Sequence, residues 1–194
     1  ASPHILIKDI NRNSYLRVLT NNIIMKKLII LFISLSFLGC ETNNVEVQKS
    51  AGEWMMEGSQ NQGKKYIMGD DDDADLAMKF MDGYENMDPQ TMVDLSADIV
   101  KFHPGDVAGV FDVDMTNTDF IVDRQKDMDS VSRNYIFIMP LKMEGTNVRF
   151  VETSFNETTY LKDGSSKSVG VYEKLYINTD NKISRVVQWH RPSN

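Results

Sequence analysis

The period of the hydrophobic pattern changes about two thirds of the way along the chain. Between residues 70 and 89 the apolar residues recur at the spacing of a helix face: Leu76, Phe80, Met81, Tyr84 and Met87. Aspartates come before this face, where the positive end of a helix dipole favours negative charge. The spacing therefore predicts a first helix here.

Two more helices and one strand are expected before the pattern changes. A short helix fits residues 89–96, because proline suits a first helical position. Ile99 to Phe102 has the composition of a strand and is followed by His-Pro-Gly. A third helix is expected from Thr116 or Asn117 to Ser130, with Phe120, Ile121 and Met128 facing inward.

Beyond residue 130 the pattern alternates with a period of two. Four stretches rich in Val, Ile, Tyr, Phe and Thr follow one another: NYIFIMPLKM, VRFVETSFNETTYLK, SVGVYEKLYIN and ISRVVQWHRP. Turn residues separate them at EGTN, KDGS and NTDN. Helices followed by a run of strands predict an α+β fold with a mainly antiparallel sheet.

The sequence from Met25 to Cys40 has the organisation of a secretory signal. Lys26 and Lys27 precede an apolar run from Leu28 to Leu38, which is too short to cross a bilayer as a helix. Gly39-Cys40 follows, and the chain then turns polar at once. This resembles the lipobox of bacterial lipoproteins, in which the cysteine takes a diacylglycerol and becomes the N-terminus after cleavage. A buried cysteine in an apolar helix is the alternative.

Four regions follow from this interpretation. Residues 1–24 precede the first methionine and are expected to be a non-native upstream extension. Residues 25–40 are the expected lipoprotein signal peptide, 41–69 a tether, and 70–194 the folded domain. The tether is expected to include a short extended piece at 65–68, and Trp54 with Met55-Met56 is expected to dock on the domain. The resemblance implies a membrane-anchored protein of the bacterial cell envelope, lipidated on Cys40.

Charge and cysteine content exclude several classes of function. From Cys40 onward the chain has 16 basic and 27 acidic residues, a net charge of −11, which disfavours binding to nucleic acid. Because Cys40 is the single cysteine, the domain has no internal disulfide, no cysteine-ligated zinc and no thiol nucleophile. No set of metal ligands and no cofactor motif emerges from the sequence.

The order of elements resembles that of the nuclear transport factor 2-like superfamily, which includes SnoaL-like polyketide cyclases and ketosteroid isomerases. The resemblance is carried by FMDGYENMDPQTMVDLSADIVKFHPGD and VGVYEKLYINTDNKISRVVQWHRP, and would cover residues 70–192. It implies helices packed into a strongly curved sheet, forming a cone around an apolar pocket. Members of the superfamily have different activities, so the resemblance assigns no catalytic residue here.

Candidate pocket residues come from the predicted helix and strands. His103 is a candidate general base, because histidine titrates near neutral pH and this one ends the first long strand. Trp189 and His190 lie on opposite faces of the last strand, and Trp189 is expected to be the pocket wall. The other candidates for the pocket lining are Tyr84, Phe150, Tyr160 and Tyr172. Each could equally be an ordinary core or surface position of a sheet.

Two motif-like stretches are disfavoured. VFDVDMTN resembles the first motif of haloacid-dehalogenase-type phosphatases, with Asp112 as nucleophile, Asp114 as acid/base and Thr116 in the last motif position. That fold requires βαβ alternation, whereas mostly strands follow here. The acidic run 70–73 is followed by Leu76 and Asp82 where a calcium-binding EF-hand loop needs glycine and glutamate.

Three hypotheses for function remain open. The first is a pocket that binds a small apolar molecule or peptide without catalysis. The second is a SnoaL-like isomerase, cyclase or dehydratase that uses a pocket histidine or carboxylate as general base. The third is a homodimeric interaction module. An ionisable pair facing into the pocket would favour the enzyme.

Overall fold

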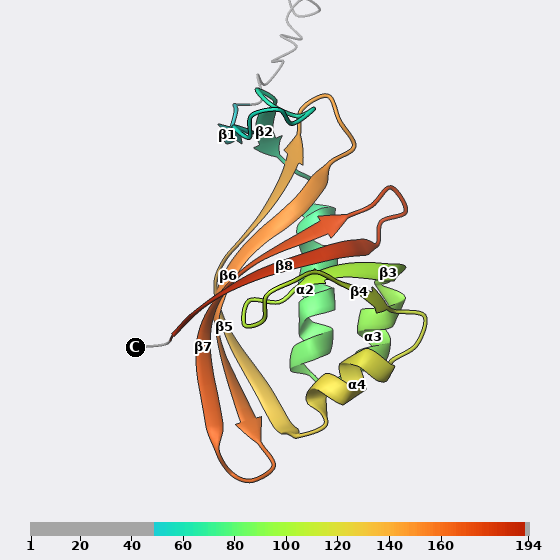
Figure 1. Ribbon diagram of the computed structural model, residues 1–194, viewed down its shortest axis with the longest axis vertical. Coiled ribbons are helices and arrows are strands. Elements are labelled where there is room, and N and C mark those ends of the chain that lie inside the picture. Colours follow the sequence, from blue (N-terminus) through green and yellow to red (C-terminus); the bar gives the residue numbers. More distant parts are fainter. Residues whose placement is uncertain (1–48, 193–194) are drawn as a thin grey trace, which may run out of the picture. The chain divides into compact units, whose positions relative to one another are not determined.

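The computed structural model describes residues 49–192, so the expected upstream extension, signal peptide and Cys40 lie outside the described residues. The described part is an α+β domain in which three helices lie against one strongly curved sheet (Figure 1). In this part of the chain the sheet has eight strands in the order β1-β2-β5-β6-β7-β8-β3-β4. Their bounds are β1 Gly52–Glu53, β2 Lys65–Met68, β3 Ser96–His103, β4 Phe111–Asp114, β5 Met128–Met143, β6 Arg149–Leu161, β7 Ser166–Ile177 and β8 Ile183–Pro192.

The first two predicted helices are confirmed. Helix α2 spans Asp71–Glu85 and buries the face that carries Ala77, Phe80 and Met81. Helix α3 spans Pro89–Asp94. The Asp88 side chain caps α3, because its Oδ1 accepts the backbone N–H of Thr91 at 3.1 Å.

The third predicted helix is shorter than expected. Helix α4 covers Asp119–Gln125 only, and β5 already begins at Met128. Strand pairing decides the outcome, because Met128 lies opposite Leu161 and Ser130 opposite Tyr160 of β6. Long-range pairing with β6 therefore overrides the local helical spacing after Lys126.

The four predicted C-terminal strands form the antiparallel meander β5-β6-β7-β8. Strand β3 joins this meander by parallel pairing with β8. Strand β4, which the pattern analysis did not predict, pairs with β3 and forms one edge of the sheet. In β4 and the loop after it, Asp112 pairs with Lys101 at 2.9 Å and Asp114 accepts a hydrogen bond from the Thr116 backbone. Neither aspartate of the phosphatase-like stretch therefore lies in a βαβ unit.

Irregular pairing accompanies the curvature of the sheet. The register shifts in β5 between Tyr135 and Phe137, and in the β3–β8 pair between Ser96 and Lys101. Such bulges bend a strand and increase its twist. The concave face holds α2, α3 and α4 (Figure 1), and its buried side chains build the core: Ala77, Met81, Val151, Phe155, Leu175 and Ile183.

Part of the expected tether is folded. Strand β2 pairs with the end of β5, and β1 pairs with β2 to form a hairpin. Trp54 lies edge-to-face against Tyr66 at 6.4 Å between ring centroids, and Tyr66 lies against Phe150 at 5.5 Å. Part of this segment thus docks on the domain through Trp54 and the hairpin, whereas Met55 and Met56 themselves are exposed.

The described residues contain neither a membrane-spanning helix nor a cluster of metal ligands. No helix between residues 49 and 192 is both long enough and apolar enough to span a membrane. Nor does that part of the chain bring three or more His, Cys, Asp or Glu side chains together as metal ligands.

Candidate functional site

A cavity of about 90 Å³ lies between the concave face of the sheet and the three helices. Its walls are mainly apolar and aromatic, and a cluster of polar side chains, most of them from the sheet, completes the lining. The lining residues are Phe80, Met81, Tyr84, Met92, Val100, Phe102, Val113, Met115, Phe120, Ile121, Arg124, Arg133, Glu157, Val171, Glu173, Val186, Gln188 and His190. This combination of apolar walls and a few convergent polar groups is typical of small-molecule sites.

Glu173 is the most deeply buried ionisable group of this cavity. Strand β7 alternates, so Val171, Glu173 and Leu175 face inward and are buried, whereas Tyr172 and Lys174 face the outer side. The Glu173 residue is 3% exposed. Val171 and Leu175, its neighbours on this face of β7, are apolar. Hydrogen-bond partners for the Glu173 carboxyl group therefore have to come from a neighbouring strand.

Within residues 49–192, only one oxygen of that carboxyl group has a hydrogen-bond partner. Gln188 lies directly opposite Glu173 in the β7–β8 pairing, and its Nε2 donates to Oε1 of Glu173 at 2.9 Å. The other oxygen, Oε2, is buried without a hydrogen-bond partner among the described residues. Burial raises the pKa of Glu173, Arg133 opposes this shift, and the negative charge of Glu157 adds to it. The net shift makes this carboxyl group easier to protonate than an exposed glutamate, and Oε2 lies buried in the cavity wall.

Arg133 and Glu157 form a second polar pair beside it. Arg133 Nε donates to Glu157 at 2.9 Å, and Nη1 donates to the Met81 carbonyl at 3.1 Å. The guanidinium also lies between two aromatic rings, 4.8 Å from the Tyr84 centroid and 4.7 Å from that of Phe155. Burial alone would lower the pKa of Arg133, but Glu157 and Glu173 raise it above its ordinary value. Arg133 is therefore a fixed cation whose donors are largely used.

The loop between β3 and β4 packs against His190, another lining residue. His190 lies opposite Val171, on the inward face of β8 with Gln188. Gly105 of the loop approaches so closely that an added Cβ would lie 2.5 Å from Cδ2 of His190. The guanidinium of Arg124, on α4, lies 5.5 Å from the Phe102 centroid and also lines the cavity. His190 and Arg124 therefore each bring a further hydrogen-bonding side chain to the lining.

Of the pocket residues proposed from the sequence, some line the cavity and others do not. Tyr84 lines the cavity as expected. His103 ends β3 but is not part of the lining, and its pKa is lowered by partial burial and by the nearby charges of Arg185 and Lys101. The proposal of His103 as the pocket base is therefore corrected in favour of His190 as the histidine that lines the cavity.

The other aromatic candidates face away from the cavity. Phe150 is buried on the outer face, between Tyr66 and Tyr176. Tyr160 and Tyr172 are also outside the lining, and Trp189 is 51% exposed. The inside–outside assignment of β8 was thus reversed: the direct pairing of Glu173 with Gln188 turns Trp189 outward.

An apolar and aromatic strip lies on this outer face. The Tyr172 ring lies 6.1 Å from that of Phe137 and 5.6 Å from that of Trp189. Tyr172 donates its hydroxyl hydrogen to Glu152, whose other oxygen pairs with Lys174 at 2.8 Å. Burial and the Glu152 carboxylate raise the pKa of Tyr172. We call Phe137, Tyr172 and Trp189 the outer aromatic strip.

Sequence analysis missed the polar lining residues: Arg133, Glu157, Glu173, Gln188 and His190. One signal was available, because alternation puts Glu173 on the same face as Leu175, and an acid amid apolar neighbours is unusual. The choice of Tyr172 as a lining candidate instead took the opposite face of β7 as the inward one. The faces of β5 and β6 could not be fixed, because the register shift at Tyr135 changes which residues of β5 point inward.

Comparison with solved structures identifies the fold. The chain is similar to a nuclear transport factor 2-like protein from Anabaena variabilis, with a TM-score of 0.50 and 11% identity over 63% of this chain and 92% of that one. The described domain has the nuclear transport factor 2-like fold. It is also similar to SalBIII, an epoxide hydrolase/cyclase-like enzyme of pyran ring formation in salinomycin, with a TM-score of 0.52 and 6% identity over 62% and 92% of the two chains.

A third similar structure is a ketosteroid isomerase candidate from Kribbella flavida, with a TM-score of 0.50 and 15% identity over 66% of this chain and 83% of that one. No protein-family model and no curated protein sequence matches the chain. The predicted cone of helices packed into a curved sheet is confirmed. At these identities the similarity establishes the fold and leaves the chemistry of the cavity to its own residues.

Proposed function

We propose that this domain binds a small, mainly apolar molecule in the cavity, with one oxygen atom of the ligand held by Glu173. We further propose that it does so at the bacterial cell envelope, anchored by lipid on Cys40. The observation that carries the binding proposal is the unpartnered Oε2 of Glu173, buried in the cavity wall. Buried polar atoms are nearly always hydrogen-bonded, so an exception calls for a partner.

The protonation state of Glu173 indicates what kind of group it binds. Since burial raises the pKa of this carboxyl group, its protonated form can donate from Oε2. Arg124 and His190 supply further donors to the lining. A carbonyl, ether or hydroxyl oxygen on the ligand matches these donors better than an ammonium group does.

The size of the cavity limits the ligand. An apolar cavity of about 150 Å³ accommodates benzene, and this one holds about 90 Å³. A ligand of only a few heavy atoms fits without rearrangement. A larger ligand would require the flexible walls Met81, Met92 and Met115 to move, which suits the adaptable methionine side chain. A peptide would fit through one side chain at most.

A second candidate function is proton transfer on such a ligand. Glu173 and His190 are diagonal neighbours on the inward face of β7 and β8, and burial shifts the pKa of Glu173 upward, the direction that a general acid requires. The similar structures include an epoxide hydrolase/cyclase-like enzyme, which supports this alternative by fold only. Catalysis would use the same two side chains that binding uses.

The first experiment is native mass spectrometry of residues 41–194, purified from cells, compared with the Glu173→Leu variant, which has no hydrogen-bond donor at this position. A retained mass that is released on denaturation, and is reduced in the variant, supports ligand binding at Glu173. An equal retained mass in both proteins moves the ligand away from Glu173. Absence of any retained mass, together with no heat of binding for small ketones and ethers, would count against the proposal. Turnover of the identified ligand by the wild type would favour the catalytic alternative.

A further inference from the structure

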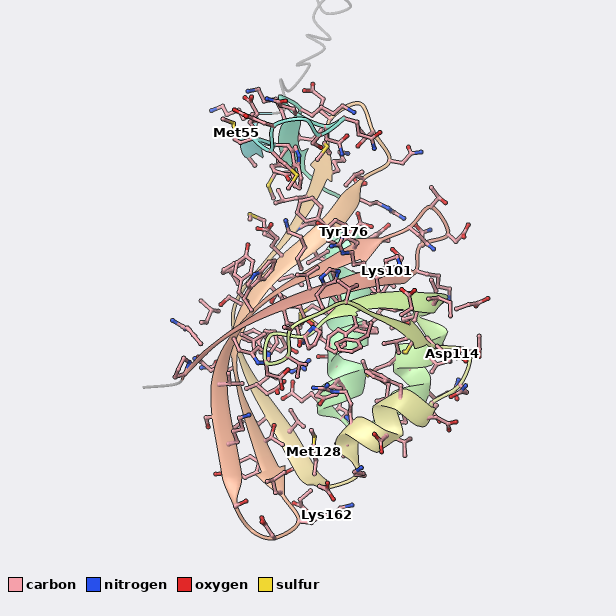
Figure 2. All side chains as sticks on the ribbon, in the orientation of Figure 1. Met55, Lys101, Asp114, Met128, Lys162 and Tyr176 are labelled. Atoms are coloured by element: carbon pink, nitrogen blue, oxygen red, sulfur yellow. The ribbon has the colours of Figure 1, made fainter. Side chains whose placement is uncertain are left out.

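The tip of the β1–β2 hairpin presents two adjacent methionines to solvent. Met55 is 74% exposed and Met56 63% exposed, while their neighbour Trp54 packs on Tyr66. Figure 2 shows Met55 at one end of the domain and Lys162, in the turn between β6 and β7, at the opposite end. Single exposed apolar residues are common on protein surfaces, so position and charge must decide what this pair contacts.

The position of the hairpin in the chain restricts its surroundings. Lys49, the first described residue, follows the expected acylated Cys40 by nine residues. A fully extended chain gains at most about 3.6 Å per residue, so this connection reaches about 32 Å at most. Since β1 begins at Gly52, the hairpin is the first element of the described residues after Cys40. A lipid anchor on Cys40 would hold the hairpin within reach of the bilayer surface.

The charge distribution also distinguishes the hairpin from the rest of the domain. Residues 49–68 contain three lysines and two glutamates, a net charge of +1. Residues 69–192 contain 13 basic and 23 acidic residues, a net charge of −10. An anionic bilayer repels the acidic surface and attracts basic residues close to it. The hairpin is therefore the part of the described domain best suited to face such a bilayer.

We propose that the hairpin tip docks the domain on the membrane, with Met55 and Met56 inserted at the boundary between lipid headgroups and acyl chains. This inference rests on the lipid anchor of the proposed function. The anchor makes insertion intramolecular, so a weak contact is sufficient because the effective concentration is high. Figure 1 shows the hairpin and α4 at opposite ends of the domain. Docking by the tip thus turns the end with α4, which contributes Arg124 to the cavity lining, away from the bilayer.

The test uses the full chain, expressed in bacteria and reconstituted in vesicles of phosphatidylethanolamine and phosphatidylglycerol. Gln60→Cys places a thiol in the hairpin turn, and Lys162→Cys places one at the far end as a control. Acylation blocks Cys40, so each variant carries one reactive thiol for an environment-sensitive fluorophore. We expect a blue-shifted emission that brominated lipids quench at position 60, and an unshifted, unquenched emission at 162. Met55→Ser with Met56→Ser should abolish the signal at position 60.

The other outcomes distinguish a failure of the hairpin contact from a failure of the lipid anchor. Equal aqueous emission at both positions, in acylated protein that floats with the vesicles, overturns the hairpin contact and leaves the anchor standing. A signal at position 60 that survives the double serine change also overturns it, because the methionines then do not make the contact. A mature protein whose mass shows no acyl chains overturns both the anchor and the hairpin proposal.

Discussion

Gln188 holds one oxygen of Glu173, through a hydrogen bond of 2.9 Å, and leaves the other oxygen of that carboxyl group without a partner among the described residues. An amide donor fixes the orientation of the acid without neutralising it. The arrangement is costly for an ionised carboxyl group in an apolar wall and much less so for a protonated one. The state of this single proton therefore links the stability of the fold to the chemistry of the cavity.

Glu173→Gln should stabilise the domain at neutral pH and remove part of its pH dependence. Because the pKa of Glu173 is raised in the folded state, that state binds more protons than the unfolded chain between the two pKa values. Stability then falls as pH rises from the unfolded value of 4.5 through the folded pKa. Each unit by which the pKa of Glu173 is raised lowers the free energy of unfolding at high pH by about 1.4 kcal/mol. The variant should regain this free energy at high pH only.

Urea unfolding of both proteins between about pH 4 and pH 8 measures this effect. We expect the two free energies of unfolding to converge at the acid end and to diverge above pH 4.5. Parallel pH curves would mean that Glu173 titrates alike in the folded and unfolded states.

Arg133→Met should destabilise the domain strongly. The change leaves Glu157 buried without the guanidinium that it binds through Nη2 at 2.8 Å, and the two side chains are 5% and 16% exposed. Removing one partner of a buried pair costs about 3–5 kcal/mol, whereas replacing both with apolar residues costs much less. We therefore expect the double variant Arg133→Met with Glu157→Met to unfold at higher urea than the single variant. A double variant as weak as the single one would show that the ring contacts of Arg133 carry the stability instead.

The fold was more predictable from the sequence than the site was. Helix α2 and the strands β5 to β8 follow from apolar periodicity, because each has a long amphipathic pattern and turn residues at its ends. The boundary at Met128 was missed, because the spacing of Met128 from Phe120 and Ile121 fits a helix face and only its pairing with Leu161 of β6 places it in a strand. Strand β4 was missed because four residues at a sheet edge carry too short a pattern.

The site depends on which face of each strand points inward, and alternation alone leaves two solutions. In β8 the choice between Trp189 and His190 followed the expectation that large apolar residues face a pocket. The structure has the opposite solution, because the outer face is itself apolar, with Phe137 and Tyr172 beside Trp189. In β7 the choice of Tyr172 as a lining residue likewise took the wrong face, and the role of Glu173 also depends on Gln188 of the neighbouring strand.

Gly105→Ala should alter the His190 side of the cavity. The added methyl would lie 2.5 Å from Cδ2 and 2.8 Å from the backbone nitrogen of His190, so the loop or the strand must shift. Overpacking of this kind costs about 1–3 kcal/mol. The Tm in thermal unfolding and the affinity for the retained ligand should both fall.

Gly170→Ala is the matched control for this change. Its methyl would meet Arg191, an exposed side chain that can rotate into solvent. We expect a stability change within about 0.5 kcal/mol of the wild type and unchanged ligand binding. If the two variants behave alike, the close approach of Gly105 to His190 does not constrain the cavity.

Trp189→Lys tests whether the outer aromatic strip joins two copies of the chain. The strip is apolar, and Glu152 and Lys174 beside it pair with each other at 2.8 Å, so two such strips can meet without separating these two charges. We infer a homodimer through this face and expect sedimentation velocity to show a dimer for the wild type and a monomer for Trp189→Lys. Folded stability should change by about 0.5 kcal/mol or less, because Trp189 is 51% exposed. Val122→Lys, on α4 and 50% exposed, is the control and should remain dimeric. A monomeric wild type would contradict the interface, and so would equal dissociation of the two variants.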